Sequence, residues 1–170
     1  TCAGNDPDDQ MRRYQLWRKE GCIPGSAVAV EVPPPVTRAL ATWQWSRKSF
    51  AGPHDPANLD PHTLVRTVAV SLCLRDRPEQ ALDVATEASR TTLQAPIVLD
   101  CCRYFAALML EAVAGASKHE LLALSGVGTA LLGRVLKPEV ELLRNTSWQS
   151  VQRPASARTA TAVLSAALAA

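Results

Sequence analysis

The chain has 170 residues, of which 47% are hydrophobic and 20% are charged, and this composition excludes a largely disordered protein. Its 18 basic and 16 acidic residues give a net charge of +2, too small an excess to indicate binding to the phosphate backbone of nucleic acid. The sequence contains no apolar run of about eighteen residues and no basic segment followed by an apolar one at its start, so it predicts neither a membrane span nor a secretory signal, and the cytoplasm is the expected location.

The first predicted helix begins at Asp6 and ends at Gly21. Asp6 is a typical N-cap residue, Pro7 suits the first helical position, and the acidic residues 8 and 9 lie near the positive end of the helix dipole. Gly21 is a typical helix stop. The larger apolar side chains recur at three-residue intervals and share one stripe: Met11, Tyr14 and Trp17.

Residues 22–35 contain small apolar residues and end in three consecutive prolines, which predicts a loop. A second helix is expected over residues 36–47, where Val36, Leu40 and Trp43 recur at helical spacing. The Gly- and Pro-rich residues 51–56 then predict another loop.

Two further helices are expected between residues 60 and 90. Asp60 and Pro61 repeat the cap-then-proline start of a third helix, and Asp76 with Glu79 forms a capping-box pattern for a fourth. The buried face of the third helix is predicted from its larger apolar residues: Leu64, Val65, Val68, Leu72 and Cys73. The fourth is expected to run through Ala81, Leu82, Ala85 and Ala88.

The most apolar predicted helix runs from Pro96 to Gly115 and should lie at the centre of the fold, because apolar residues occur on nearly all its sides. Ser117 and Glu120 form a second capping box, and the chain ends in an Ala-rich helical run. With no long period-two alternation, the predicted fold class is all-α, a multi-helix bundle forming one domain over residues 1–170.

The two ends of the sequence bear on whether the predicted bundle is complete. The chain begins with Thr1, and its last helical run has no capping residue, so we expect the middle of a longer protein with an incomplete bundle at both ends. A complete small protein with a frayed terminus is the alternative.

Neither a metal site nor a catalytic nucleophile is predicted within the chain. Helix capping accounts for the acidic residues 6, 8 and 9, and the three histidines share no metal-binding spacing. Gly126 and Gly128 indicate a turn, because the lysine and strand of a phosphate loop are missing. The cysteines are odd in number without a CxxC pair, so they are expected to be reduced and mostly buried: Cys2, Cys22, Cys73, Cys101 and Cys102.

Several segments resemble one known family. Residues 6–17, DPDDQMRRYQLW, followed by Glu20 and Gly21, closely resemble the segment DPEDQMRRYLRWYREGY of ADP-ribosylglycohydrolases. Residues 91–96, TTLQAP, and residues 99–104, LDCCRY, are similar to the family's TTHQAP and LDACRY patterns. Residues 64–66 resemble the end of the family's GNGxLMR loop, and residues 161–169 resemble its helix beginning TLEAALWA.

The resemblance implies an all-α enzyme that removes ADP-ribose from modified protein side chains or small conjugates, with two magnesium ions in a central cleft. The family carries its metal ligands in an upstream TDDT-like motif and a downstream GDxDT-like motif, and neither occurs among the 170 residues. The chain is therefore expected to be a fragment of such a hydrolase, inactive by itself and without a metal, with magnesium belonging to the full-length parent.

The candidate substrate-binding residues also come from the resemblance, and they are Asp60, His62, Arg66, Thr91 and Thr92. Arg66 and the two threonines match the family pattern, whereas the residues from Asp60 to His62 replace its Gly-Asn-Gly, and Leu93 replaces its histidine. These departures leave open a divergent or inactive branch. The rival interpretation is a non-catalytic helical module that keeps the fold and binds a partner or an ADP-ribosyl group.

Overall fold

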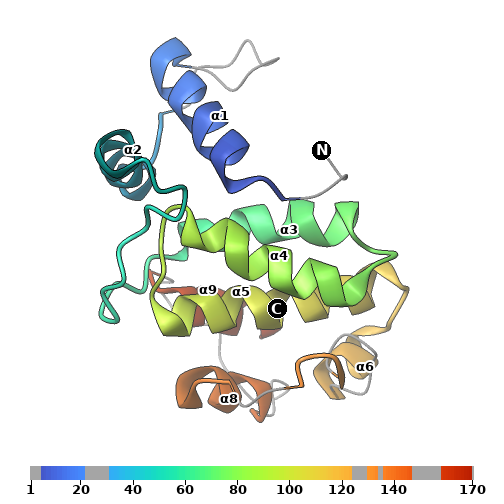
Figure 1. The fold of residues 1–170 in the computed structure, drawn as a ribbon. Helices are drawn as coiled ribbons and strands as arrows, with labels where there is room; N and C mark the ends of the chain where they lie inside the picture. The colour runs from blue at the N-terminus through green and yellow to red at the C-terminus, as the bar shows by residue number, and fades with distance from the viewer. Residues whose placement is uncertain (1–4, 22–30, 124–129, 134–135, 147–157, 170) are drawn as a thin grey trace.

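A computed structural model describes residues 5–21, 31–123, 130–133, 136–146 and 158–169, and every regular element among them is a helix, which confirms the predicted all-α class (Figure 1). The helices are α1 (Pro7–Glu20), α2 (Pro34–Ser46), the short 3-10 helix η1 (Pro61–Thr63), α3 (Leu64–Cys73), α4 (Pro78–Arg90), α5 (Pro96–Val113), α6 (Lys118–Ala123), α8 (Pro138–Arg144) and α9 (Ala160–Leu168). No described helix is both long enough and apolar enough to cross a membrane.

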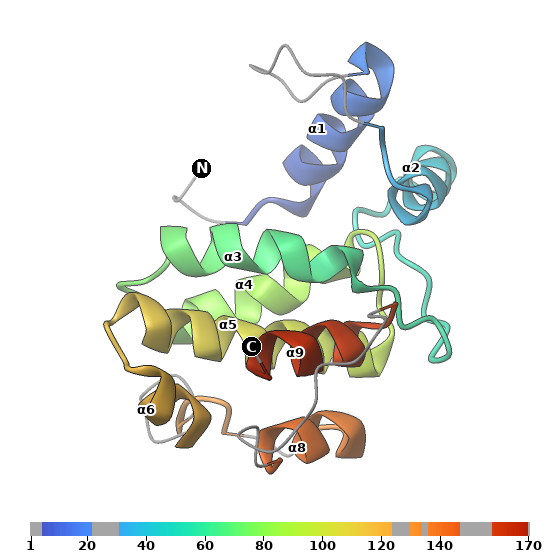
Figure 2. The ribbon, with the colours of Figure 1, turned by 180° about the vertical axis from the view of Figure 1, so that it is seen from behind.

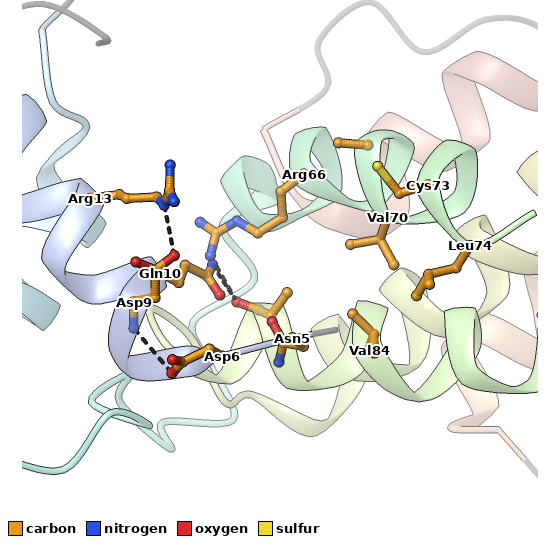
Figure 3. A pocket seen from close by; sticks show the side chains of 12 residues that line it. Asn5, Asp6, Asp9, Gln10, Arg13, Arg66, Val70, Cys73, Leu74 and Val84 are labelled. Carbon is orange, nitrogen blue, oxygen red and sulfur yellow. Dashed lines mark hydrogen bonds and ion pairs between the residues drawn. The ribbon is translucent and has the colours of Figure 1, made fainter. Parts of the chain in front are cut away.

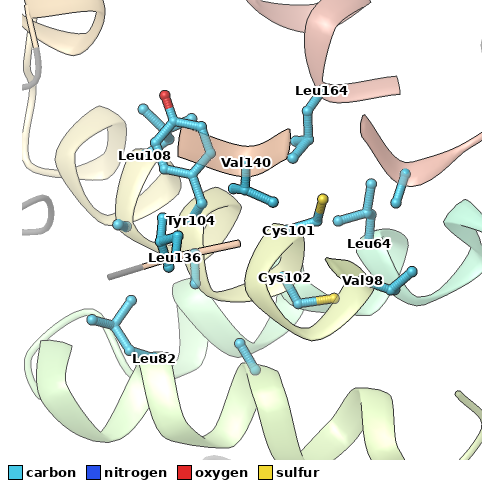
Figure 4. Packing of buried hydrophobic residues seen from close by; sticks show 14 of the residues in the cluster. Leu64, Leu82, Val98, Cys101, Cys102, Tyr104, Leu108, Leu136, Val140 and Leu164 are labelled. Atoms are coloured by element: carbon cyan, nitrogen blue, oxygen red, sulfur yellow. The ribbon is translucent and has the colours of Figure 1, made fainter. Parts of the chain in front are cut away.

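Helix α5 is the centre of the main core, as the sequence predicted. Helices α3 and α4 pack against it on one side, and α6, α8 and α9 contact it from the others (Figures 1 and 2). Leu82, Cys102, Tyr104 and Val140 are among the buried side chains at these contacts (Figure 4). Burial raises the pKa of Tyr104 to about 12, so the phenol stays neutral at physiological pH.

The cysteines divide into buried and exposed thiols. Cys101 and Cys102 fill the core as predicted, and burial raises the pKa of both thiols, which makes them poor nucleophiles. Cys73, expected on a buried face, is exposed instead. Cys2 and Cys22 lie outside the described residues, as do Gly126 and Gly128.

Helices α1 and α2 share a smaller core of their own and stand at one end of the helix stack (Figures 1 and 2). This second cluster contains Met11, Val36, Ala39, Leu40 and Ala51, with Tyr14 and Trp43 packed against it. The Trp43 indole N–H also donates to the Asp8 carboxylate at 3.2 Å. Contacts of α1 with α4 join this cluster to the main bundle.

Several predicted helix ends are confirmed by their hydrogen bonds. The Asp6 side chain accepts from the backbone N–H groups of Asp8 and Asp9, and Gly21 ends α1 in the left-handed region at φ +71°. Ser117 and Glu120 form the predicted reciprocal capping box before α6, and the hydrogen bonds from Ser117 hold the pKa of the Glu120 carboxyl below its usual value.

The predicted buried face of α3 is confirmed at Leu64 but was wrong at Val65, Leu72 and Cys73. Leu64 is buried, but Val65 is 77% exposed and Leu72 is 46% exposed. Beside Leu64, the core side of α3 carries the small polar residues Thr67 and Ser71, and Thr63 of η1 is buried just before them. Small side chains let α3 pack closely on α4 and α5, and the Ser71 hydroxyl is satisfied by the Thr67 carbonyl at 3.0 Å. Both faces of this helix repeat at helical spacing, so periodicity could not select the inner one.

Two helix starts also differ from the prediction. The capping box of Asp76 and Glu79 was wrong, because α4 begins at Pro78 with Arg77 as N-cap and no side-chain cap. Helix α2 begins at Pro34 within the expected loop. In both cases a proline occupies the first turn, where its fixed φ suits a helix and its missing N–H leaves no donor unsatisfied.

Candidate functional site

The candidate substrate-binding residues come together where the start of α3 meets the turn between α4 and α5. Asp60 and His62 lie at η1, Arg66 follows in the first turn of α3, and Thr91 and Thr92 form the turn after α4. The Asp60 side chain accepts from the His62 backbone N–H at 2.9 Å and so caps η1.

The His62 imidazole bridges these two segments. Its Nδ1 lies 2.8 Å from Asp60 Oδ1, and its Nε2 lies 2.9 Å from Thr92 Oγ1. Burial lowers the pKa of His62, the positive charge of Arg66 lowers it further, and both outweigh the opposing effect of Asp60. The neutral ring therefore donates from Nδ1 to the Asp60 carboxylate and accepts the Thr92 hydroxyl proton at Nε2.

The Arg66 guanidinium ties α3 to α4 and α1. Its Nη1 donates to the Ala88 carbonyl at 2.9 Å and to Thr91 Oγ1 at 3.2 Å. The Thr91 hydroxyl in turn donates to the same carbonyl at 2.8 Å. On its other side, the guanidinium carbon lies 5.3 Å from the centre of the Tyr14 ring, within range of a cation–π interaction.

The candidate residues differ in how much of each side chain is exposed and can therefore contact a ligand. The Asp60 side chain is 36% exposed and that of His62 is 10% exposed, whereas Thr91 and Thr92 are fully buried. A buried hydroxyl has no surface for a substrate in this structure, so the threonines hold His62 and Arg66 in place. Asp60 is the most accessible member of the Asp60, His62 and Thr92 network.

The loop before η1 is locked against this turn by contacts that sequence reasoning missed. Gln94 donates from Nε2 to the Gly52 carbonyl at 2.7 Å, and its backbone N–H donates to the Pro53 carbonyl at 2.9 Å. A Cβ at Gly52 would lie 2.2 Å from the Leu93 backbone nitrogen, so only glycine fits this close approach. Leu93, which replaces the family's histidine, is fully buried in the main core.

The described residues do not fit a magnesium site. They contain no group of three or more His, Cys, Asp or Glu side chains that could hold a metal ion. Among the acidic residues of α1, Asp8 pairs with Arg12 and Asp9 with Arg13, and the hydrogen bond to each arginine holds the pKa of its carboxyl below the usual value.

Comparisons with known proteins point to one family. The model of the family described as ADP-ribosylglycohydrolase matches residues 1–170. A chain in a solved structure titled "ADP-ribosylglycohydrolase-related protein complex" is 27% identical, with a TM-score of 0.75 over 96% of the present chain and 51% of that chain. The present chain thus spans about half the length of that relative. No curated protein matches it.

Proposed function

Because the chain belongs to the ADP-ribosylglycohydrolase family, we propose that it is part of a hydrolase that cleaves the glycosidic bond between ADP-ribose and a protein side chain or a small conjugate. The match of the family model along all 170 residues carries this proposal. The partners are then ADP-ribosylated proteins or ADP-ribose conjugates, and the cytoplasm is the proposed location.

The contribution that we assign to this chain is substrate binding at the start of α3. Asp60 presents a partly exposed carboxylate, which can accept hydrogen bonds from two neighbouring ribose hydroxyls. His62 donates to that carboxylate and orients it, while Thr92 fixes the imidazole and Arg66 with Thr91 fixes the backbone of the α4–α5 turn. In this proposal Asp60 contacts the substrate, and His62, Arg66, Thr91 and Thr92 hold Asp60 and its surroundings in position.

Magnesium, on the same proposal, belongs to the full-length protein. The described residues offer no three-ligand group for it, so no step of the reaction is assigned to a metal held by this chain. We therefore expect the 170-residue chain neither to bind magnesium specifically nor to release ADP-ribose.

The binding role is tested by calorimetric titration of the chain with ADP-ribose. Asp60→Asn should weaken binding about tenfold or more, because a charge-assisted hydrogen bond contributes roughly 1.5 to 3 kcal/mol. Asp76→Asn is the matched control, because that carboxylate is 86% exposed and lies beyond the other end of α3. Equal affinities for wild type and Asp60→Asn, or no binding at all, would contradict the binding role. ADP-ribose release by the unaltered chain would contradict its inactivity.

A non-catalytic binding module is the second candidate function. It is favoured by the position of Leu93, which lies in the core where the family pattern has a histidine. Assays of the longest natural reading frame that contains this chain separate the two candidates. Turnover of an ADP-ribosylated arginine or serine peptide supports the hydrolase, and ADP-ribose binding with magnesium but without turnover supports the binding module.

A further inference from the structure

A pocket of about 260 Å³ lies between α1, α3 and α4, where the two hydrophobic clusters meet (Figure 3). Its lining is polar toward α1 and apolar toward the far end of α3. The polar side chains are Asn5, Asp6, Asp9, Gln10, Arg13 and Arg66, and the remaining lining residues are Ala69, Val70, Cys73, Leu74, Val84 and Ala88. Neither Asp60 nor His62 takes part in it.

Within the part of the chain that the structure describes, some N–H groups of Arg66 have no hydrogen-bond acceptor at this pocket. Both of its hydrogen bonds to the described part of the chain are made by Nη1, so Nη2 and Nε have no protein acceptor there. The acceptors of Nη1 are a carbonyl and a hydroxyl, and the guanidinium otherwise contacts the face of the Tyr14 ring, so all of its partners among the described residues are uncharged. Figure 3 shows the Arg66 side chain reaching from α3 toward the polar wall on α1.

The other charged groups of the lining already have partners. Arg13 donates from Nε to the Asp9 carboxylate at 2.7 Å, and the Asp6 carboxylate accepts hydrogen bonds from the backbone N–H groups of residues 8 and 9 at the start of α1. Arg13 and Asp9 neutralise one another and the Asp6 carboxylate is held by backbone N–H groups, so Arg66 is the cation in this lining that lacks a carboxylate partner among the described residues. The pocket therefore favours a single negative charge beside Arg66.

The opposite wall is suited to a short hydrocarbon chain. Val70 and Leu74 from α3 face Val84 from α4 across the apolar end of the pocket (Figure 3). Each methylene group buried there would contribute roughly 0.8 kcal/mol to binding. The volume lies just below the roughly 300 Å³ at which pockets for drug-sized ligands begin, so the ligand must be small.

We propose that this pocket binds a small amphipathic monocarboxylate, with its carboxylate on Arg66 and its apolar chain between Val70 and Val84. A phosphate monoester is less suitable, because its second negative charge would face the carboxylates of Asp6 and Asp9 in the same lining. This inference goes beyond the proposed function and does not depend on ADP-ribose binding.

Calorimetric titration with hexanoate, hexanamide and hexyl phosphate tests the ligand class. Hexanoate should bind at least tenfold more tightly than hexanamide, which has the same chain without the charge, and more tightly than hexyl phosphate. Equal binding of hexanoate and hexanamide would overturn the role of Arg66 as an anion site. Equal or tighter binding of hexyl phosphate would overturn the assignment to a monocarboxylate.

Two variants and one chemical readout locate the site. Arg66→Gln should lose about tenfold in hexanoate affinity, while Arg75→Gln, a change at an exposed arginine just after α3, should not. In the unaltered chain, hexanoate should slow the reaction of Cys73 with a thiol reagent, because Cys73 lines the pocket, and Cys73→Ser identifies its signal. Wild-type affinity in Arg66→Gln, or an unchanged Cys73 rate at saturating hexanoate, would overturn the proposal.

ADP-ribose distinguishes this pocket from the proposed substrate site. Saturating ADP-ribose should leave the hexanoate affinity unchanged, since the pocket excludes Asp60 and His62. Competition between the two ligands would make the pocket part of the substrate site and overturn a separate monocarboxylate site. A chain that binds hexanoate but not ADP-ribose would contradict the proposed function while supporting this inference.

Discussion

Replacing Gly52 by alanine should disrupt the contact between the loop before η1 and the turn that carries Thr91 and Thr92. The added Cβ would lie 2.2 Å from the Leu93 nitrogen and 2.5 Å from the Thr92 carbonyl carbon. Ordinary contacts between such atoms begin at roughly 3.5 Å, so the two segments must separate by about 1 Å. The obstructing atoms belong to the backbone, so no side-chain rotation can relieve the clash.

The cost follows from the hydrogen bonds that cross this contact. The Gly52 N–H donates to the Arg90 carbonyl at 3.2 Å. The Gln94 side chain donates to the Gly52 carbonyl at 2.7 Å, and its backbone N–H donates to the Pro53 carbonyl at 2.9 Å. A separation of about 1 Å moves these pairs beyond hydrogen-bonding range. The buried Gln94 backbone N–H then loses its acceptor and the Gln94 side chain loses the shorter of its bonds to the Gly52 and Phe50 carbonyls, at roughly 1 to 3 kcal/mol for each lost bond. Overpacking alone costs about 1 to 3 kcal/mol. We therefore expect Gly52→Ala to lower the free energy of unfolding by about 3 kcal/mol or more.

Urea denaturation of Gly52→Ala and Gly21→Ala measures this difference. Gly21 has φ +71° and no heavy atom within 4 Å of an added Cβ, so its replacement carries only the backbone cost of about 1 to 2 kcal/mol. A loss below about 1 kcal/mol for Gly52→Ala, or a loss smaller than that of the control, would refute the reasoning.

Leu108→Ala should lower the free energy of unfolding by about 2 to 3 kcal/mol, near the lower end for core leucines. The loss is modest because Leu108 borders an apolar groove of about 310 Å³, so its truncation removes fewer contacts than at an enclosed site. A loss under about 0.5 kcal/mol in urea denaturation would show that this position is peripheral. Because the pKa of His62 is lowered in the folded chain, protonation of this ring favours the unfolded chain. The contribution of His62 to the free energy of unfolding is therefore complete above pH 6.5 and is lost as the pH falls below that value, by up to about 1.4 kcal/mol per pH unit. Urea denaturation midpoints measured from pH 5 to 7.5 should depend less on pH in His62→Gln than in the wild type. The control His119→Gln, which changes an exposed histidine, should keep the wild-type pH dependence. An unchanged pH dependence in His62→Gln would assign the effect to other groups. Asp6→Ala should lower the free energy of unfolding by about 1 kcal/mol because it removes the N-cap of α1, whereas Asp6→Asn should retain most of the stability. Equal urea denaturation curves for wild type and Asp6→Ala would show that the cap does not stabilise the fold.

The sequence by itself determined the features that depend on neighbours within a few residues. The cap at Asp6, the helix stop at Gly21 and the box at Ser117 are local hydrogen bonds, so their residue types were enough to predict them. The all-α class and the central position of α5 also followed from patterning, because a helix that is apolar on most sides must be surrounded. The family followed from the resemblance of several segments, which the family model confirms.

Only the tertiary structure decided which side of α3 faces inward and what the candidate site residues do. Val65 and Thr67 lie on faces with the same helical repeat, and close packing against α4 and α5 selects the small polar side. His62 and Thr92 are thirty residues apart, and their hydrogen bond exists because α3 packs beside the α4–α5 turn. The same packing buries Thr92 and leaves Asp60 partly exposed, since a side chain's exposure depends on what the rest of the chain places over it.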